Sequence, residues 1–508
     1  MLLELEELRE DARALATALA SLRSRRAAGL SAQATFRELI KAHPLCTSAD
    51  GLAQAREELG NALEEDPRRA GRVARLTSLR GFLVQARAMA LEPGAAQELF
   101  DLPQRPLVRP PGDAGLHGAL PAVAVERDLR LVRARDKRAE LEAALAEALG
   151  SADGTRSAAW EAAQAAQAEA GLGNSGERRS LSSSDGVNSV HLLAEGLLDR
   201  TDALARDLGG WLLERHTGAE PFPGGAERHD LLHLLWAPRC ASAFPRGEMM
   251  RTVRRWAEML RLRLDLGAGE AISLDDEDRP LKWPGAHAEP IDPPWEVRVS
   301  LLLEEGPRAL GQLLSAVGVA QLRAGPPSDA PPEDLWFGDP ALPYACAALL
   351  EGLLREPEFL RRCAKVELPP DDARAISIAS VFDARIAAAR CLAAAQAQEQ
   401  GLGGRAASAH RDLFARAALC ELPRGLALCD LDPFTPGAEL QGRALAGRLR
   451  AVLREKFDED WWRNPRALPK LQALWGRGGR PTLGELWAEL GGPPGIDPLV
   501  DGLAEACR

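Results

Sequence analysis

The chain has 508 residues and a formal net charge of -11, with 46% hydrophobic and 27% charged residues. No basic tract stands out, which argues against a nucleic-acid or anionic-membrane surface, and no apolar run is long enough to cross a bilayer. The first twenty residues alternate charge with Leu and Ala, so no signal peptide is expected, and the eight scattered cysteines are typical of reduced thiols in a cytoplasmic protein.

The N-terminal third of the sequence predicts helices. Ala, Leu, Arg and Glu are abundant, whereas β-branched and aromatic residues are scarce, which favours a mainly α fold. Residues 1 to about 100 read as several amphipathic helices, with breaks at Pro44 and Asp66-Pro67. A loop rich in Pro and Gly is predicted from Leu102 to Pro121, and helix again from about Glu126 to Gly150.

A polar stretch then divides the chain. Residues 171–189 are rich in Gly and Ser, and we interpret them as a flexible linker between an N-terminal helical region, 1–170, and a second domain, 190–508. The stretch contains G-x-G-x-x-G at Gly171–Gly176. A dinucleotide loop needs a strand before that motif, and an Ala-rich helix precedes it here, so the loop interpretation is favoured.

The second domain is also mostly helical. Helices are predicted at Val190–Arg215 and Glu227–Leu235, and short strands at Ala271–Leu274 and Trp295–Leu301. These strands form the single small β region, 271–303. After them comes a helix from Pro307 to Arg323, and the rest of the chain is helical with breaks near 369–370, 401–404, 430–437 and 476–481.

The helix at 307–323 is the most informative segment because of what it lacks. It resembles the zinc-binding helix of the thimet-oligopeptidase/oligoendopeptidase class of metallopeptidases, which carries His-Glu-x-Gly-His. Ser315 and Val319 stand at the two His positions and Ala316 at the Glu position, while Gly318 is as the family has it. That chemistry needs two imidazoles one turn apart and a Glu that activates a zinc-bound water, and these residues supply none of it.

The resemblance extends over about residues 190–500. The family's third zinc ligand is a Glu on a second helix, and Tyr344 stands at that position. Near the C-terminus, Thr435 and Glu439 stand at the positions of the family's catalytic tyrosines. Tyr344 is the only tyrosine in the chain, so no other phenol can replace them. A protonated phenol is a poor zinc ligand.

The resemblance implies an elongated helical body with a deep groove and one small antiparallel sheet at its rim. We expect neither zinc nor any other cofactor, and we expect no catalytic residue. The first hypothesis is a pseudopeptidase that binds a peptide or a partner protein in the former substrate groove. The candidate groove-lining residues are His287, Ser315, Val319, Tyr344, Glu439 and Arg443.

Two alternatives remain open, as does the oligomeric state. In the first, His229-Asp230-x-x-His233 places two imidazoles on one helix face, with Glu258 as a third ligand, and the protein is an active zinc oligopeptidase. Asp230 is one methylene shorter than the Glu that would serve as base, so the motif is interpreted first as two histidines that share a polar helix face by chance. In the second, the chain is purely a structural helical scaffold for protein interactions.

Overall fold

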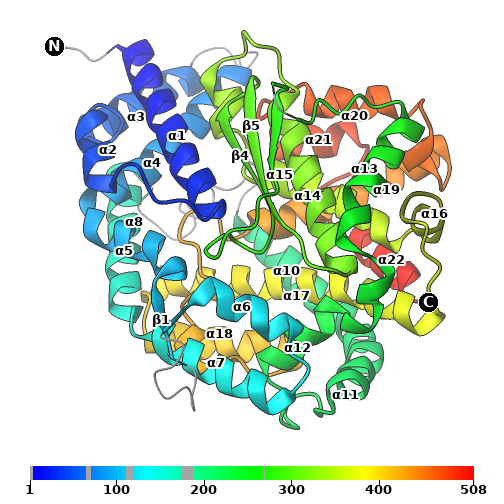
Figure 1. Ribbon diagram of the computed structural model, residues 1–508. Coiled ribbons are helices and arrows are strands. Elements are labelled where there is room, and N and C mark those ends of the chain that lie inside the picture. The colour runs from blue at the N-terminus through cyan, green and yellow to red at the C-terminus, as the bar shows by residue number, and fades with distance from the viewer. Residues whose placement is uncertain (1–3, 65–69, 110–118, 173–186, 268) are drawn as a thin grey trace.

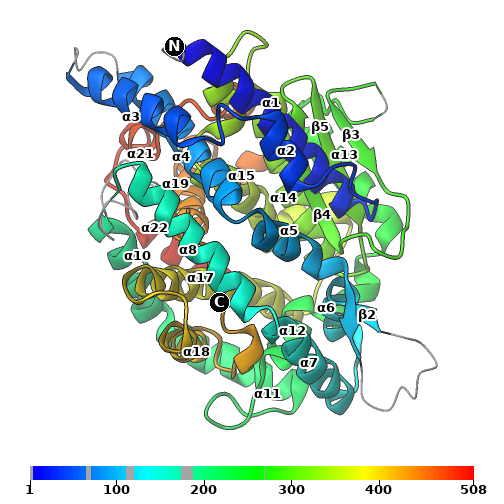
Figure 2. The ribbon, with the colours of Figure 1, turned by 90° about the vertical axis from the view of Figure 1, so that its left-hand side faces the viewer.

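The computed structural model describes residues 4–508 except 65–69, 110–118, 173–186 and 268. Almost every element within these residues is a helix, which confirms the mainly α fold class (Figure 1). The N-terminal helices lie on one side of a small sheet and the C-terminal helices on the other, and the outline in both ribbon views is rounded rather than elongated (Figures 1 and 2). No described helix is long and apolar enough to cross a membrane.

The first hundred residues form several amphipathic helices, as predicted. The helices of this region are α1 (Leu5–Ala27), α2 (Phe36–Ala42), α3 (Ala49–Glu64), α4 (Ala70–Leu91) and α5 (Pro93–Asp101). Thr35 and Glu38 form a capping box that starts α2, and Pro44 follows its end. The predicted break at Asp66-Pro67 lies outside the described residues. Leu8, Leu15, Leu52 and Leu83 join these helices in one core cluster.

The next segment differs from the prediction in two ways. Its elements are η2 (Leu102–Gln104), β1 (Pro106–Val108), β2 (Leu120–Pro121), α6 (Ala122–Leu131), α7 (Arg135–Gly150) and α8 (Asp153–Glu169). The predicted loop contains an antiparallel pair, β1 with β2. The helix expected from Glu126 to Gly150 is broken, because buried Arg138 donates to the carbonyls of Val132 and Arg133 and holds that turn open.

Most of the predicted linker, at 173–186, lies outside the described residues, and its last residues already belong to a helix. The elements that follow are α10 (Val187–Leu204), the π-helical turn η4 (Ala205–Gly210), α11 (Trp211–Thr217), α12 (Arg228–Trp236), η5 (Pro238–Ala243) and α13 (Arg246–Leu260). The prediction of helix at Val190–Arg215 and Glu227–Leu235 is therefore confirmed.

The sheet at the centre of Figure 1 has three strands, β3 (Ile272–Asp275), β4 (Gly285–Asp292) and β5 (Glu296–Leu302), in the order β3-β5-β4. The hairpin β4–β5 is antiparallel, as expected, but β3 runs parallel to β5 with Ile272 opposite Val297. The expectation of one antiparallel sheet is thus wrong on two points, since this sheet is mixed and β1–β2 forms a second. Lys282 stabilises the crossover from β3 to β4, because its Nζ donates to the carbonyls of Asp275 and Glu277, each at 2.8 Å.

The C-terminal part is helical, with breaks where they were predicted. Its elements are α14 (Pro307–Ala324), η6 (Glu333–Phe337), α15 (Ala341–Glu351), η7 (Gly352–Arg355), α16 (Pro357–Phe359), η8 (Leu360–Ala364), α17 (Pro370–Gln400), α18 (Gly404–Ala418), η9 (Arg424–Leu426), α19 (Ala438–Phe457), η10 (Trp461–Arg463), α20 (Leu468–Trp475), α21 (Leu483–Glu489) and α22 (Asp497–Ala506). The long helix α17 crosses the molecule below the sheet in Figure 1.

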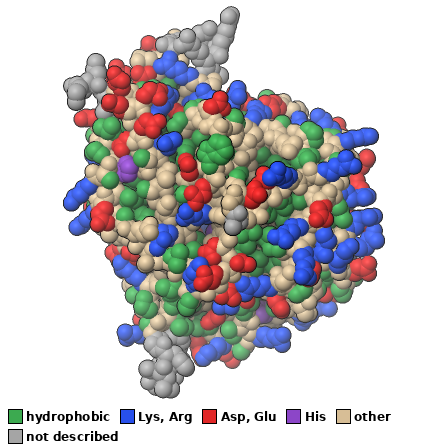
Figure 3. All heavy atoms as spheres, turned by 45° about the horizontal axis from the view of Figure 1, so that its top comes forward, with side chains coloured by type: hydrophobic (Ala, Val, Ile, Leu, Met, Phe, Trp, Pro, Cys, Tyr) green, Lys and Arg blue, Asp and Glu red, His purple; other side chains and the backbone are tan. Residues whose placement is uncertain are grey.

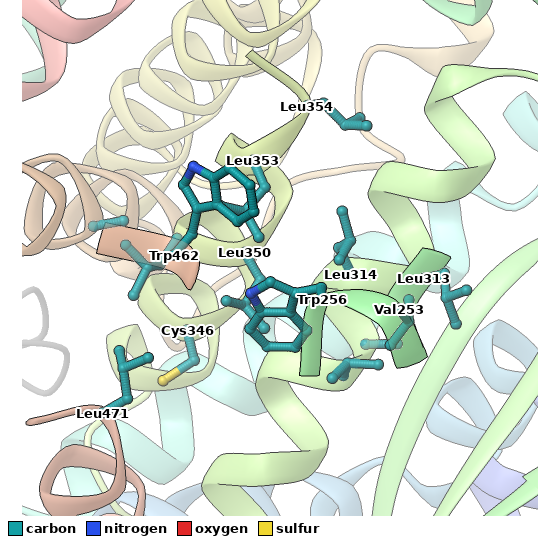
Figure 4. Close-up of a cluster of buried hydrophobic side chains, with 14 of the residues drawn as sticks. Val253, Trp256, Leu313, Leu314, Cys346, Leu350, Leu353, Leu354, Trp462 and Leu471 are labelled. Carbon is teal, nitrogen blue, oxygen red and sulfur yellow. The ribbon is translucent and has the colours of Figure 1, made fainter. Parts of the chain in front are cut away.

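The helix α15 packs tightly between α14 and α19. A Cβ at Gly318 would lie 2.4 Å from the carbonyl oxygen of Cys346, and one at Gly442 would lie 2.5 Å from Cβ of Tyr344, so both close approaches require glycine. The indoles of Trp256 and Trp462 belong to a buried apolar cluster that also contains Leu314 of α14 and Leu350 of α15 (Figure 4). On the face shown in Figure 3, acidic and basic side chains are interspersed.

Candidate functional site

The side chains along one face of α14 are only half-buried. Arg308, Gln312, Ser315, Val319 and Arg323 follow helical spacing along this face and are half-buried, whereas Ala316, Gly318 and Ala320 on the other faces are buried. Positions 315 and 319, where the resemblance in the sequence puts the two histidines of the family, are thus neighbours on this half-buried stripe. This is the arrangement that a metal-binding helix needs, without the residue types.

The side chains on this stripe do not fit zinc. Ser315 Oγ donates weakly to the carbonyl of Ala347 on α15, at 3.5 Å. Val319 offers only methyl groups, and Ala316, which is 4% exposed, packs into the apolar core. Zinc is bound in proteins by imidazole, thiolate and carboxylate groups, and the positions 315, 316 and 319 carry none of these.

Tyr344, which the resemblance in the sequence puts at the third-ligand position of the family, projects from α15 and is 46% exposed. Partial burial of the ring raises the pKa of its phenol, and the carboxylates of Glu439 and Asp432 raise it further. The phenol is therefore neutral at pH 7, which makes it a poor ligand for a cation.

A network of six charged side chains connects α14, α15, α17 and α19. Its members are Arg308, Glu351, Asp383, Arg390, Glu439 and Arg443. Glu439 accepts from Arg390 at 2.6 Å and from Arg443 at 3.0 Å, so the structure brings two predicted site residues, Glu439 and Arg443, into contact. Asp383 accepts from Arg308 at 3.0 Å.

The charges of this network balance, with three arginines against three carboxylates. Burial alone would raise the pKa of Asp383, but the charges of Arg308 and Arg443 outweigh burial and lower it. Burial opposes the charged form of Arg443, yet Glu439 and Asp383 raise its pKa. The carboxylates of this network are thus already neutralised by arginine, and the network has no surplus negative charge to attract a divalent cation.

A cavity of about 1220 Å³ lies beside the stripe, between the N-terminal helices and the sheet edge. Val319 and Arg323 of α14 line it, together with Ala288–Pro290 of β4, and the small residues Thr77, Ser78 and Gly81 of α4 form part of the opposite wall. This is the deep groove that the fold class predicts. Because β4 is an edge strand, one side of its backbone is not paired with β5.

Of the six residues predicted to line the groove, only Val319 lines this cavity, together with Thr435 from the degenerate positions. Thr435 donates from its hydroxyl to Asp432, at 2.5 Å. His287 lies on β4 and donates to the carbonyl of Pro284 at 3.2 Å; burial lowers the pKa of its imidazole. Ser315 and Tyr344 do not line the cavity, because α15 packs beside α14 there.

The alternative zinc motif lies on α12. Asp230 is fully buried and accepts from Arg135 at 2.9 Å and from Arg138 at 3.0 Å. Burial would raise the pKa of its carboxyl, but the hydrogen bonds from His229 and Arg135 lower it. His233 donates through Nδ1 to the carbonyl of Arg130, and burial lowers the pKa of His233 to about 4. Asp230 is thus committed to two arginines and is a weak general base.

The expected ligand set is not gathered around His229. The ligand atoms that lie within 4.8 Å of one another belong to Glu142, Glu227 and His229, among the residues the structure describes. Glu258 is exposed on α13 and, like His233, is not part of this group. Glu142 already accepts from Arg228 at 3.0 Å, so a cation would have to share Glu142 with a guanidinium. Metal binding by His229, His233 and Glu258 stays a prediction.

Sequence reasoning missed four charged residues of this region, Arg308, Arg323, Asp383 and Arg390. Arg308 and Arg323 could have been found, because they share the helical spacing of Ser315 and Val319. Asp383 and Arg390 gave no local signal, since they approach the site on α17 through tertiary packing.

No protein-family model matches the sequence, and no curated protein sequence matches it. Solved structures do. The structure of Trypanosoma cruzi metallocarboxypeptidase 1 is similar with a TM-score of 0.60 and 12% identity, covering 99% of both chains. An oligoendopeptidase F structure from Bacillus anthracis has a TM-score of 0.61 at 11% identity, over 99% of this chain and 96% of that one.

The M32 carboxypeptidase from Deinococcus radiodurans is similar with a TM-score of 0.58 and 13% identity, covering 99% of each chain. Similarity at this level of identity, over the whole length, is similarity of fold. The chain therefore has the fold of the M32 carboxypeptidases and oligoendopeptidase F, as the resemblance in its sequence implied at the level of architecture.

Proposed function

We propose that this protein binds an extended peptide in the cavity beside α14 and does not cleave it. The observation that carries the proposal is the pairing of an intact cavity with a helix face that holds Ser315 and Val319 in place of metal ligands. The structural neighbours are named as carboxypeptidases and an oligoendopeptidase, which act on peptides, so a peptide is the ligand that a cavity in this fold favours.

The sheet edge supports the binding mode. Ala288, Glu289 and Pro290 of β4 line the cavity, and β4 has β5 on one side only. A peptide in extended conformation can pair its backbone with such an edge, while its side chains occupy pockets on either side. The small residues of α4 leave room for those side chains, since a Cβ at Gly81 would meet no atom within 4 Å.

Loss of catalysis is supported by the donor set. We infer that the protein needs no zinc, because hydroxyl, methyl and phenol groups stand where imidazoles and a carboxylate would be needed. The balanced arginine network beside these positions supplies positive charge of its own. The residues therefore do not fit the metal, and no hydrolytic step follows from them.

Peptide binding can be tested by filling the cavity. Gly81→Leu places an isobutyl group in the cavity from the middle of α4. This group should displace ligand contacts and lower the affinity for peptides at least about tenfold. The affinity is measured with a fluorescent library of acetylated, amidated octapeptides. Gly60→Leu is the matched control, because Gly60 is an exposed residue of α3 with open space around it and lies outside the cavity lining. If both variants bind like the parent, the peptide does not occupy this cavity.

Metal loss can be tested by restoring the ligands. The variant Ser315→His, Ala316→Glu, Val319→His and Tyr344→Glu should gain zinc relative to the parent, as measured by elemental analysis of the folded proteins. The parent should hold no stoichiometric zinc and cleave no peptide of the library.

The alternatives give different results in these assays. Stoichiometric zinc in the parent that is lost on His229→Ala would favour the active zinc oligopeptidase that uses His229 and His233. No peptide binding at all, with no zinc, would favour the helical scaffold.

A further inference from the structure

Arg323 differs from the other charged residues that line the cavity. It lies in the last turn of α14, half-buried, and donates through Nη1 to the carbonyl of Leu335 at 3.1 Å. Its Nε is buried and, among the described residues, has no acceptor within hydrogen-bond distance. No carboxylate of the described residues lies within ion-pair distance of its guanidinium.

The neighbouring charges are already paired. Arg75 on α4 forms a two-bond ion pair with Asp334 of η6, at 2.8 and 3.1 Å. Arg23 of α1 pairs with Glu289 of β4, at 3.0 Å. These two pairs already use the carboxylates of Asp334 and Glu289. Burial and the charge of Arg23 lower the pKa of Arg323, and they outweigh the charge of Glu289, which raises that pKa through space.

The two remaining acids of the lining are engaged by backbone amides. Glu485 accepts from the backbone N–H of Thr482 at 2.9 Å, as part of the capping box of α21. Asp339 accepts from the N–H groups of Ala341 and Leu483. Among the described residues, Arg323 therefore has no carboxylate within ion-pair distance, and neither has Arg480, which is exposed at the same cavity.

A second unsatisfied donor lies on the same wall. The indole N–H of Trp336, in η6, is buried and finds no acceptor among the described residues. Unpaired buried donors cost stability unless a ligand satisfies them. Arg323 Nε and Trp336 Nε1 could each donate a hydrogen bond to an acceptor oxygen of a ligand.

We propose that the bound peptide carries an acidic side chain, Asp or Glu, whose carboxylate pairs with Arg323 and accepts from the donors beside it. This rests on the peptide-binding function proposed above and specifies the ligand class of the same cavity. The arginine fork suits a planar carboxylate, with which it makes two parallel hydrogen bonds.

An internal side chain fits better than the terminal carboxylate of a peptide. Arg323 does not stand alone in the cavity lining: Val319 lies one helical turn before it on α14, and Asp334 and Trp336 flank Leu335, whose carbonyl Arg323 contacts. A peptide that pairs with β4 would therefore extend beyond Arg323 at both ends, which places a side chain, and not a chain end, against the guanidinium.

The test uses acetylated, amidated octapeptides of alanine, leucine and serine with one glutamate moved through each position, and the same peptides with glutamine. At the best position the wild-type chain should bind the glutamate peptide at least about tenfold more tightly than its glutamine counterpart, the value expected of one charge-assisted contact. Arg323→Gln should abolish this preference. Arg254→Gln is the matched control, since Arg254 is exposed on α13 outside the cavity.

Two further measurements keep the inference falsifiable. If Arg323→Gln does not fold, Arg323→Lys replaces it and should keep part of the preference, because the charge remains and the fork is lost. In the wild type, the preference for glutamate should fall as ionic strength rises.

Each outcome decides the matter. Equal affinity for glutamate and glutamine peptides would overturn the pairing with Arg323 and leave peptide binding intact. A preference that follows a free C-terminus, in peptides without the terminal amide, would overturn the internal side chain. No binding of any peptide would refute the proposed function itself.

Discussion

Replacing Asp383 by Asn should destabilise the fold through the charge network on α17. Asp383 is 8% exposed and accepts from Arg308 at 3.0 Å, and the substitution keeps its shape while removing its charge. Removing one partner of a buried ion pair costs about 3–5 kcal/mol. Because Arg308 keeps Glu351 as a partner at 3.3 Å and some solvent access, we expect the lower part of that range or less, about 2–3 kcal/mol.

The assay is thermal unfolding by calorimetry. An unfolding entropy of about 2.1 cal/mol/K per residue, over 508 residues, gives about 1.1 kcal/mol/K, so Asp383→Asn should lower Tm by about 2–3 °C. The matched control is Asp371→Asn on the same helix, because the ion pair of Asp371 with Arg215 is exposed on both sides. That pair is worth about 0–1 kcal/mol, and its loss should lower Tm by less than about 1 °C.

The effect should also depend on pH. The pKa of Asp383 is lower in the folded chain than in the unfolded one, so its contribution to stability is complete above the unfolded value, about 3.9, and is lost as pH falls through the folded value. The difference in Tm between wild type and Asp383→Asn should hold from pH 8 to about pH 5 and shrink below about pH 4. Equal losses of Tm in Asp383→Asn and Asp371→Asn at pH 7 would refute the reasoning.

Two other predictions concern packing and thiols. Gly318→Ala should lower the free energy of unfolding, measured in urea, by about 1–3 kcal/mol, because its methyl group would lie 2.4 Å from the carbonyl oxygen of Cys346. Gly60→Ala is the control and should raise the free energy of unfolding by up to about 1 kcal/mol, since Gly60 has open space around it. An unchanged free energy of unfolding in Gly318→Ala would contradict the close packing of α14 on α15. Burial raises the pKa of the Cys240 and Cys363 thiols to about 12. At pH 8 these thiols should therefore react slowly with a thiol reagent in the native protein and rapidly only in denaturant. Rapid labelling of Cys240 in the folded chain would show that its environment is open.

Much of the helical architecture could be predicted because the signals are local. Pro307 and the Gly325-Pro326 pair mark the ends of α14, and Pro369-Pro370 and Gly401 mark those of α17. The break between α6 and α7 could not be predicted in this way, since it depends on the buried guanidinium of Arg138. The parallel pairing of β3 with β5 was missed for the same kind of reason, because it depends on Lys282 and a crossover connection.

The sequence alone predicted the residue types at the motif positions, but it did not predict which residues would line the cavity. The interpretation of Ser315 and Val319 as degenerate ligand positions rests on a motif with fixed spacing, and it stays a prediction. Which residues line the cavity depends on how α15 packs beside α14, so Tyr344 and Ser315 were expected there and lie elsewhere. Arg323 was within reach of sequence reasoning, but its lack of a carboxylate partner is a tertiary property.

The contacts that join α4 and α1 to η6 bear on how fast a ligand could enter or leave the cavity. Phe82 stacks on Phe337 with ring centres 4.3 Å apart, Arg75 binds Asp334, and Arg9 of α1 binds Glu333 at 2.7 Å. Parting these walls would strip Glu333 and Asp334, which are 1% and 4% exposed, of their arginines. An enzyme must release product at every turnover and needs walls that separate readily. For a peptide bound as proposed above, these contacts favour slow exchange, because the walls cannot part without breaking both ion pairs.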